Sequence, residues 1–198
     1  MPYNCHGRPP GAQRPATTHD LLTPPSLLAA LGALRVTPDG YALGRDPFGL
    51  DPCASEGQPW PTARTMWTVH EDGAAQDWSP HGEVYLNSPY GSDLYLWLAR
   101  LADHGDGLAL LYARTDTQGF ASQVWDRATA VYFFTRRLWF HRPVSGHQCP
   151  ANCGGPMALA IYGERSVQRV RRLLKPGGDY PGCLVAAAGR KPRRRKAT

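Results

Sequence analysis

The sequence predicts an α/β fold in which a mostly parallel sheet carries helices on both faces. Three observations lead to this prediction. Apolar runs of strand length recur along the chain, runs with helical spacing lie between them, and turn residues separate the two kinds of run. Strands that alternate with helices are typical of a parallel sheet, because each crossover helix packs back onto the sheet.

The expected elements follow one another along the chain. A helix is predicted over residues 23–34, where Thr23 lies near the N-cap and prolines suit the first turn. A second helix is predicted within "SDLYLWLARLADHG" (92–105), which has the apolar spacing of a packing helix. The predicted strands are a segment that ends at Asp51, "ARTMWTVH" (63–70), "EVYLN" (83–87), the start of "DGLALLYARTDT" (106–117), two strands within "TAVYFFTRRLWF" (129–140) broken near Arg136 and Arg137, and "GPMALAIYG" (155–163).

The chain of 198 residues is long enough for one domain with a real core. Residues 1–18 are rich in proline and glycine, which predicts a disordered N-terminal segment. Residues 19–164 then form the folded domain, and residues 165–198 a basic C-terminal helix followed by a disordered tail. In that helix we expect Val167, Val170, Leu173 and Leu174 to face inward and Arg165, Arg169 and Arg172 to face outward.

The positive charge is confined to one end of the chain. Residues 1–164 hold 11 Lys and Arg against 15 Asp and Glu, whereas residues 165–198 hold 11 against 1, so the net charges are −4 and +10. A basic C-terminal run can contact phosphates without reading base sequence, and it can equally be a solubilising tail.

Cysteine usage and hydropathy point to a cytoplasmic protein. The five cysteines are scattered and odd in number, and the N-terminus has no apolar segment typical of a secretory signal. No run approaches the 18 apolar residues of a membrane span, so no membrane partner is expected.

The tetrapeptide Asn87, Ser88, Pro89 and Tyr90 follows a predicted buried strand directly. An exocyclic aromatic amine becomes nucleophilic when two fixed acceptors hold its hydrogens, and the Asn87 side chain and the Ser88 carbonyl are such a pair. Pro89 fixes its own φ and confines Ser88 to extended backbone. Tyr90 offers a face on which a flipped-out base can stack. The four residues therefore predict a catalytic site for amino methylation.

Six strings in order carry a resemblance to a known family. They are "DPCAS" (51–55), "EDGAAQDW" (71–78), "GEVYLNSPYG" (82–91), "ALLYARTDTQGF" (109–120), "RRLWF" (136–140) and "MALAIYG" (157–163). Together they resemble the phage-type DNA N6-adenine methyltransferase (Dam) family over most of the folded domain. The resemblance implies a Rossmann-like fold, S-adenosylmethionine as cofactor, and adenine flipped from double-stranded DNA as methyl acceptor.

The resemblance also implies where the cofactor binds. The turn Asp51, Pro52, Cys53 and Ala54 matches the family's cofactor loop, where an acidic group can bind an ammonium or a ribose hydroxyl. Thr23 and Pro24 match a further wall of that pocket. Glu71 and Asp72 follow the next predicted strand, where a carboxylate can bind the cofactor's ribose or adenine amine.

Four charged residues are candidates for DNA contact. Arg114 and Asp116 belong to the family's "ARTDT" string and follow a buried strand, where Arg114 can reach a phosphate or a base edge. A purely structural Arg–Asp pair is the alternative. Arg136 and Arg137 lie at a predicted strand junction and can face DNA. Because no separate recognition domain fits in this length, we expect base readout from loops 114–123 and 141–156.

Several alternatives stay open. The same acceptor geometry serves N4 of cytosine, and pocket size would decide between the two amines. The family usually has proline where Ser88 stands, a large apolar residue at Ala74 and proline at Tyr112, so a decayed nucleic-acid-binding protein without turnover is a second alternative. His141, His147, Cys149 and Cys153 are zinc ligands by type but not by spacing, and no metal is expected.

The reading favoured by the sequence is a monomeric, adenine-specific DNA methyltransferase in a bacterial cytoplasm, encoded by a phage or another mobile element. Its partner would be double-stranded DNA and its cofactor S-adenosylmethionine. The role implied by the family resemblance is protection of that element from host restriction.

Overall fold

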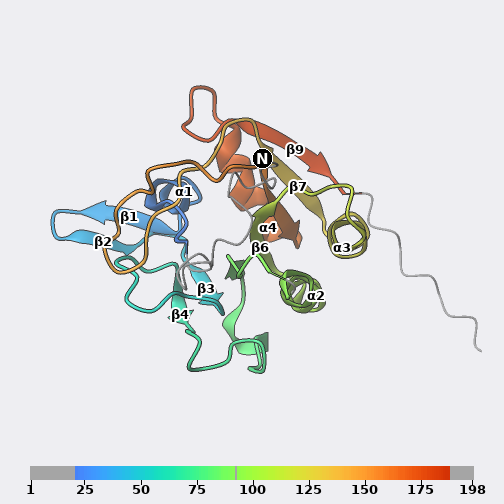
Figure 1. Ribbon diagram of the computed structural model, residues 1–198, viewed down its shortest axis with the longest axis horizontal. Coiled ribbons are helices and arrows are strands. Elements are labelled where there is room, and N and C mark those ends of the chain that lie inside the picture. The colour runs from blue at the N-terminus through green and yellow to red at the C-terminus, as the bar shows by residue number, and fades with distance from the viewer. Residues whose placement is uncertain (1–20, 92, 188–198) are drawn as a thin grey trace, which may run out of the picture.

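A seven-stranded sheet forms the centre of the computed structural model, which describes residues 21–91 and 93–187 (Figure 1). The strand order is β4-β3-β5-β6-β8-β7-β9. The strands are β3 (Phe48–Asp51), β4 (Ala63–Met66), β5 (Val84–Leu86), β6 (Gly107–Tyr112), β7 (Ala130–Phe134), β8 (Met157–Tyr162) and β9 (Gly182–Ala186). The predicted disordered segment 1–18 and the end of the basic tail lie outside the described residues.

The direction of the strands divides the sheet into two halves. Neighbours among β4, β3, β5 and β6 pair in parallel, whereas β8 is antiparallel to both β6 and β7, and β9 is antiparallel to β7. β7 therefore points the same way as the four parallel strands. The carboxyl ends of β3, β4, β5, β6 and β7 meet at one edge of the sheet, called the rim below. The expected mostly parallel sheet is thus observed, with an antiparallel half.

Helices cover both faces of the sheet, as the sequence predicts for an α/β fold. They are α1 (Pro25–Ala30), α2 (Leu94–His104), α3 (Gln118–Phe120) with the π-helical η2 (Ala121–Trp125), and α4 (Glu164–Val170) with the 3₁₀ turn η3 (Arg171–Leu174). Leu27 of α1 and Val170 of α4 share one core cluster, while Leu98 of α2 and Val124 of η2 share the other. A short 3₁₀ turn, η1 (Ser79–His81), precedes β5. Among the described helices, none combines the length and the apolar character that a bilayer crossing requires.

The first predicted helix is too long by about one turn. α1 ends at Ala30, and the chain turns at Gly32, whose φ of +82° lies in the left-handed region that glycine adopts at low cost. An unexpected antiparallel hairpin then follows, built from β1 (Leu34–Thr37) and β2 (Gly40–Leu43). The apolar residues at 31–34 belong to this turn and hairpin and not to a continuing helix.

Of the two strands predicted within residues 129–140, one is observed and the other is not. Only β7 forms there, and the following residues cross the rim as irregular chain, although Leu138 and Phe140 are buried. β9 was also not foreseen, because its burial alternates only weakly and its pairing with β7 depends on contacts distant in sequence. The segment after Gly163 thus contributes a helix and a sheet strand to the fold.

An ion-pair network fixes α4 to the body and corrects the predicted orientation of Arg169. That side chain is 2% exposed, and its guanidinium donates hydrogen bonds to both carboxylate oxygens of Glu83, itself 1% exposed. Arg172 pairs with Asp46 at 2.8 Å. Burial acts to raise the pKa of Asp46, but the Arg169 and Arg172 guanidiniums outweigh it and lower that pKa overall. Leu174, expected inside, is 46% exposed.

Candidate functional site

The chain changes direction across the sheet between β3 and β5. From β3 the chain crosses to β4 on one side, and it then returns to β5 on the other side of β3. Leu50 of β3 is the register partner of Val84 of β5, so the carboxyl ends of these two strands are neighbours. In open α/β sheets, ligands bind in the crevice at such a switch point. Asp51 ends one of these strands, and Asn87 follows the other directly.

Asp51 is a buried carboxylate that faces this crevice. It is 3% exposed, and its two oxygens accept hydrogen bonds from the Thr62 hydroxyl and from the Cys53 backbone N–H, the latter at 3.0 Å. Across residues 21–91 and 93–187, no Lys, Arg or His side chain forms an ion pair with it. Burial raises its pKa to about 6, while the two hydrogen bonds act in the opposite direction. A cation or a hydroxyl donor from a ligand would stabilise its charged form.

The turn after Asp51 is held close to the end of β4. The Ala54 N–H donates to the Trp67 carbonyl, and the Trp67 N–H donates to the Asp51 carbonyl, both at 2.9 Å. Burial, with the nearby Asp51 charge, raises the pKa of the Cys53 thiol. Cys53 is therefore a protonated packing residue and not a thiolate nucleophile, as its sequence context suggests.

The expected acceptor tetrapeptide lies at the same place. The Asn87 amide nitrogen donates to the Leu21 carbonyl at 2.8 Å, and its side-chain oxygen accepts from the Tyr90 hydroxyl at 2.9 Å. These two bonds fix the orientation of the amide. Ser88 is 2% exposed, and its hydroxyl oxygen has no hydrogen-bond partner in the described part of the chain. Pro89 is exposed.

The Tyr90 ring does not lie free for stacking. It packs edge-on against Tyr112 and Phe140, with ring centroids 5.0 and 6.3 Å away. Burial raises the pKa of its hydroxyl well above the ordinary value, so it remains a hydrogen-bond donor to Asn87. In this structure Tyr90 positions the Asn87 amide. Its ring would have to turn outward to stack on a base.

A small hollow joins the two strand ends. Its walls include Thr23, Asp51, Cys53, Trp60 and Asn87. The hollow has about 10 Å³ of free space, enough for one water molecule. The Trp60 indole nitrogen is buried and makes no hydrogen bond within the described ranges. The walls of the hollow therefore include one buried donor without a hydrogen-bond partner, the Trp60 N–H, and one buried carboxylate without a cationic partner, Asp51, among the described residues.

Two of the expected cofactor residues lie away from this hollow. Glu71 and Asp72 are exposed, and Glu71 accepts hydrogen bonds from the backbone and hydroxyl of Thr68 in a local turn. These Thr68 hydrogen bonds lower the pKa of Glu71. The lack of a side chain at Gly73 nevertheless allows this turn to pack closely against the Asp51 loop. A Cβ at residue 73 would lie 2.1 Å from the Pro52 carbonyl oxygen. Thr23 lines the hollow and bonds the Tyr85 hydroxyl at 2.6 Å, whereas Pro24 lines a neighbouring one.

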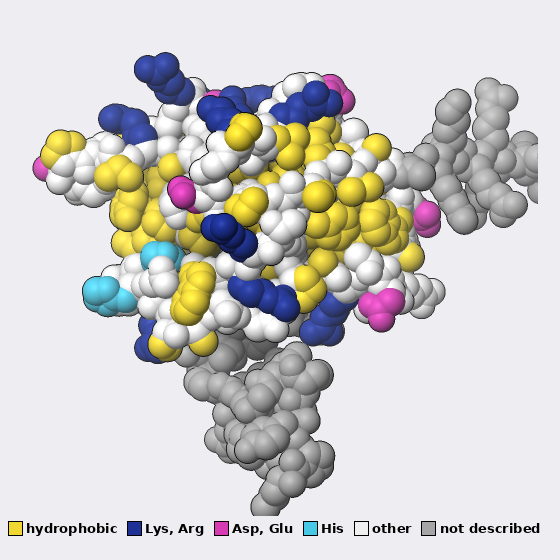
Figure 2. Space-filling view, turned by 90° about the horizontal axis from the view of Figure 1, so that it is seen from above, with side chains coloured by type: hydrophobic (Ala, Val, Ile, Leu, Met, Phe, Trp, Pro, Cys, Tyr) yellow, Lys and Arg dark blue, Asp and Glu magenta, His cyan; other side chains and the backbone are white. Residues whose placement is uncertain are grey.

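The four expected DNA-contacting residues are exposed and lie at the rim, after β6 and β7. The Arg114 guanidinium lies over the Tyr112 ring, 5.9 Å from its centroid. No ion pair joins Arg114 and Asp116 in the part of the chain that is described, so the structural-pair alternative is not observed. Arg136 and Arg137 follow β7 after one intervening residue, Thr135. Figure 2 shows a face of the molecule on which basic side chains lie among hydrophobic surface.

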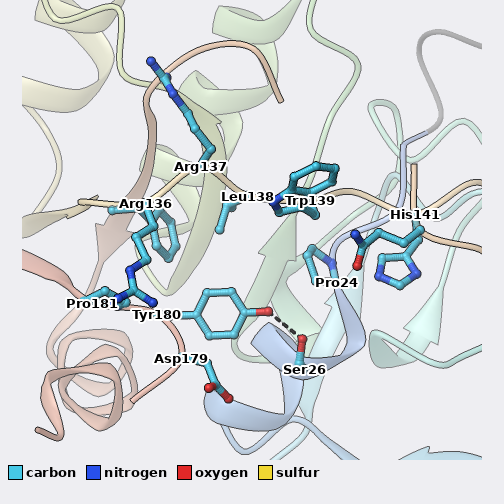
Figure 3. A pocket seen from close by; sticks show the side chains of 12 residues that line it. Pro24, Ser26, Arg136, Arg137, Leu138, Trp139, His141, Asp179, Tyr180 and Pro181 are labelled. Atoms are coloured by element: carbon cyan, nitrogen blue, oxygen red, sulfur yellow. Dashed lines mark hydrogen bonds between the residues drawn. The ribbon is translucent and has the colours of Figure 1, made fainter. Parts of the chain in front are cut away.

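Arg136 and Arg137 border the larger hollow of the rim (Figure 3), which has about 270 Å³ of free space. It lies between Pro24, Arg136, Trp139 and Tyr180. Sequence reasoning missed its Tyr180 wall, because this residue precedes the unforeseen β9. It also missed Trp60 and Thr62 at the smaller hollow, where "PWPT" carries no pattern that marks a ligand site.

In the loop that holds the zinc-type residues 141–153, two of these side chains contact backbone carbonyls. His141 Nδ1 lies 2.8 Å from the Gly146 carbonyl, and the Cys153 thiol donates to the Gly155 carbonyl at 3.1 Å. Burial raises the pKa of the Cys149 thiol. Over residues 21–91 and 93–187, no three His, Cys, Asp or Glu side chains lie together in an arrangement able to hold a metal ion.

The chain matches no known family model, no curated protein and no solved structure.

Proposed function

We propose that this protein is an S-adenosylmethionine-dependent DNA methyltransferase that acts on the exocyclic N6 amine of adenine. One observation carries the proposal: the Asp51 turn and Asn87 come from neighbouring strands at the switch point of the sheet and line one hollow. The order of six strings resembling the phage-type adenine methyltransferases supports the same reading.

The donor set around the hollow fits this cofactor. The buried Asp51 carboxylate would accept from the methionine ammonium or a ribose hydroxyl, and the unpaired Trp60 N–H would donate to a carboxylate or ring nitrogen. The cofactor supplies the methyl group on a sulfonium. Because the hollow holds only about one water molecule, residues 21–24 and 58–62 must separate to admit it.

The acceptor groups are suited to an amine. Asn87 Oδ1 has a second lone pair beside the one that accepts from Tyr90, and the Ser88 carbonyl stands next to it in the chain. Held by these two oxygens, the amine directs its lone pair at the methyl carbon. With the cofactor bound, its sulfonium would release the methyl group to the amine nitrogen as the S–C bond breaks, and the amine would lose one proton to solvent. Positioning of this kind is a main source of rate in bimolecular transfers.

Transfer of labelled methyl from S-adenosylmethionine to unmethylated duplex DNA tests the proposal. The product nucleosides are separated and identified by mass. N6-methyladenine supports the proposal, whereas N4-methylcytosine would keep the mechanism and change the substrate. No transfer and no cofactor binding would favour a nucleic-acid-binding protein without turnover.

Replacement Asn87→Ala should abolish transfer and leave cofactor affinity within about threefold of the wild type. Asn87→Asp should also lose most activity, because a carboxylate cannot donate to the Leu21 carbonyl. Gln168→Ala is the matched control, since Gln168 is an exposed amide on α4, which follows the carboxyl end of β8 at the edge opposite the rim, and it donates to Glu164. Turnover and cofactor binding are measured on the same preparations. Equal loss of both in Asn87→Ala would contradict the assigned role.

A further inference from the structure

The larger hollow at the rim has two aromatic walls. Trp139 is 41% exposed, and the Tyr180 ring lies across the floor of the pocket (Figure 3). Tyr180 is held in place, because its hydroxyl bonds Ser26 at 2.6 Å and its carbonyl accepts from the Tyr132 hydroxyl at 2.7 Å. A fixed ring and an exposed indole in the walls of one pocket offer flat apolar surface to a planar group. Bases stack on such rings without regard to sequence.

Two cationic side chains border the same space. Neither Arg136 nor Arg137 has an ion pair or a side-chain hydrogen bond with any residue of the described ranges. Both are exposed, so a ligand can reach them. The carboxylate of Asp179 lies at the opposite end of the pocket from Arg137 (Figure 3). The two guanidiniums point in different directions: that of Arg136 lies beside Tyr180 and Pro181, on the same side of the pocket as Asp179, whereas that of Arg137 points away from Tyr180 (Figure 3). The pocket thus offers one cationic group and one carboxylate near its Tyr180 wall.

The pocket adjoins the small hollow of the proposed methyl-transfer site. Thr23 lines the small hollow and Pro24 lines the larger one, so consecutive residues separate the two. His141 lines the larger hollow, and its ring packs edge-on against Trp60 of the smaller one, with centroids 5.3 Å apart. The backbone bonds between Leu22 and His141, at 2.8 and 3.0 Å, join the same two walls.

We infer that this pocket binds a second nucleotide of the DNA strand, unstacked from the duplex beside the target adenine. Its phosphate would meet Arg136, and its base would stack on Trp139 or Tyr180, with Asp179 accepting from an exocyclic amine where the base carries one. The free space of about 270 Å³ suits one nucleotide and not two. The inference rests on the proposed function, because it takes the occupant to be DNA held at the neighbouring site.

Photocrosslinking tests the location directly. Full-length protein is irradiated with single-stranded and duplex oligodeoxynucleotides in which 5-iododeoxyuridine replaces thymidine at random positions. The halogenated base joins to aromatic side chains on which it stacks. Mass mapping should find the crosslink on Trp139 or Tyr180. Crosslinks confined to other positions would overturn the inference. Preferential crosslinking to RNA oligonucleotides of the same length would show that the pocket takes RNA, and would overturn DNA as its occupant.

Binding of the single-stranded oligonucleotide to variants supplies the second measurement. Trp139→Leu should weaken it by roughly 5- to 150-fold, the range for loss of one stacked base. Arg136→Ala should reduce the slope of log affinity against log salt by about 0.7, the value for one lost phosphate contact on a single strand. Tyr180→Phe keeps the ring and should bind like the wild type. Arg35→Ala is the matched control, an exposed arginine on the β1–β2 hairpin.

The outcomes separate the pocket from the proposed activity. If Trp139→Leu and Arg136→Ala bind and methylate DNA like the wild type, the pocket inference fails while the activity stands. If the wild type transfers no methyl group but crosslinks at Trp139 and loses affinity in these variants, the proposed activity fails and the pocket stands. Thermal melting of each variant confirms that it is folded.

Discussion

At the scale of single residues, Asp51 links stability and ligand binding. Its carboxylate is buried with two hydrogen bonds and no cationic partner among the described residues, and burial raises its pKa to about 6. Since the unfolded value is lower, the folded state holds the Asp51 proton more tightly between about pH 4 and pH 6. This contribution therefore favours folding at low pH and is lost as the pH rises through 6.

Substitution Asp51→Asn should remove this pH dependence. Asparagine can accept from the Cys53 N–H and donate to the Thr62 oxygen, so both existing contacts are kept in kind. The free energy of unfolding of the wild type, minus that of the variant, should fall by on the order of 3 kcal/mol between pH 4 and pH 7. Urea denaturation at a series of pH values measures it. Parallel curves for the two proteins would show that Asp51 does not titrate as described.

The position of a site residue along the chain was easier to predict than the direction of its side chain. The places of Asp51 and Asn87 at the ends of β3 and β5 agree with the strands expected to end near them, whereas their roles in binding and catalysis stay predictions. The inward turn of the Tyr90 ring was not foreseen, since it depends on Tyr112 and Phe140, which are distant in sequence. The exposed placement of Glu71 depends in the same way on a local turn with Thr68.

At the scale of elements, α4 shows how tertiary contacts can override an amphipathic pattern. The pattern of apolar residues in 165–174 predicts that every arginine faces water, and this is wrong for Arg169. Glu83 precedes β5, and Asp46 precedes β3, and together they place carboxylates under the helix. A buried guanidinium with two carboxylates is tolerated where a lone one would not be. The apolar spacing within residues 165–174 carries no information about these carboxylates, because they lie far away in the sequence.

Arg169→Met should therefore destabilise the fold by about 3 to 5 kcal/mol, because it leaves the Glu83 carboxylate buried with the Ser166 hydroxyl and the more exposed Arg165 as its remaining partners. Arg171→Met, at an exposed arginine two residues further along, should change stability by less than about 0.5 kcal/mol. Arg169→Lys should fall between the two, since it keeps the charge but loses the bidentate contact. Equilibrium urea denaturation compares them. Similar losses for Arg169→Met and Arg171→Met would contradict the network.

At the scale of the whole molecule, the boundary between acidic and basic sequence does not coincide with the end of the folded domain. The sequence separates an acidic body from a basic C-terminal part, yet residues 164–186 of that part complete the fold with α4, η3 and β9. Several of its arginines are used there, with Arg165, Arg169 and Arg172 all paired to carboxylates. Six further basic residues, Arg190, Lys191 and Arg193 to Lys196, lie close together in the sequence beyond the described residues.

Replacing those six basic residues by glutamine in the full-length chain should weaken DNA binding at all sequences alike. Each lost phosphate contact lowers the slope of log affinity against log salt by about 0.9 on a duplex, and cofactor binding and thermal stability should not change. Arg136→Ala, by contrast, should lower the slope by one contact and also reduce crosslinking at Trp139. Affinity for duplex DNA, measured by fluorescence anisotropy at several salt concentrations, distinguishes the two variants. If the glutamine variant keeps the wild-type slope, the basic run makes no phosphate contact and its charge serves solubility alone.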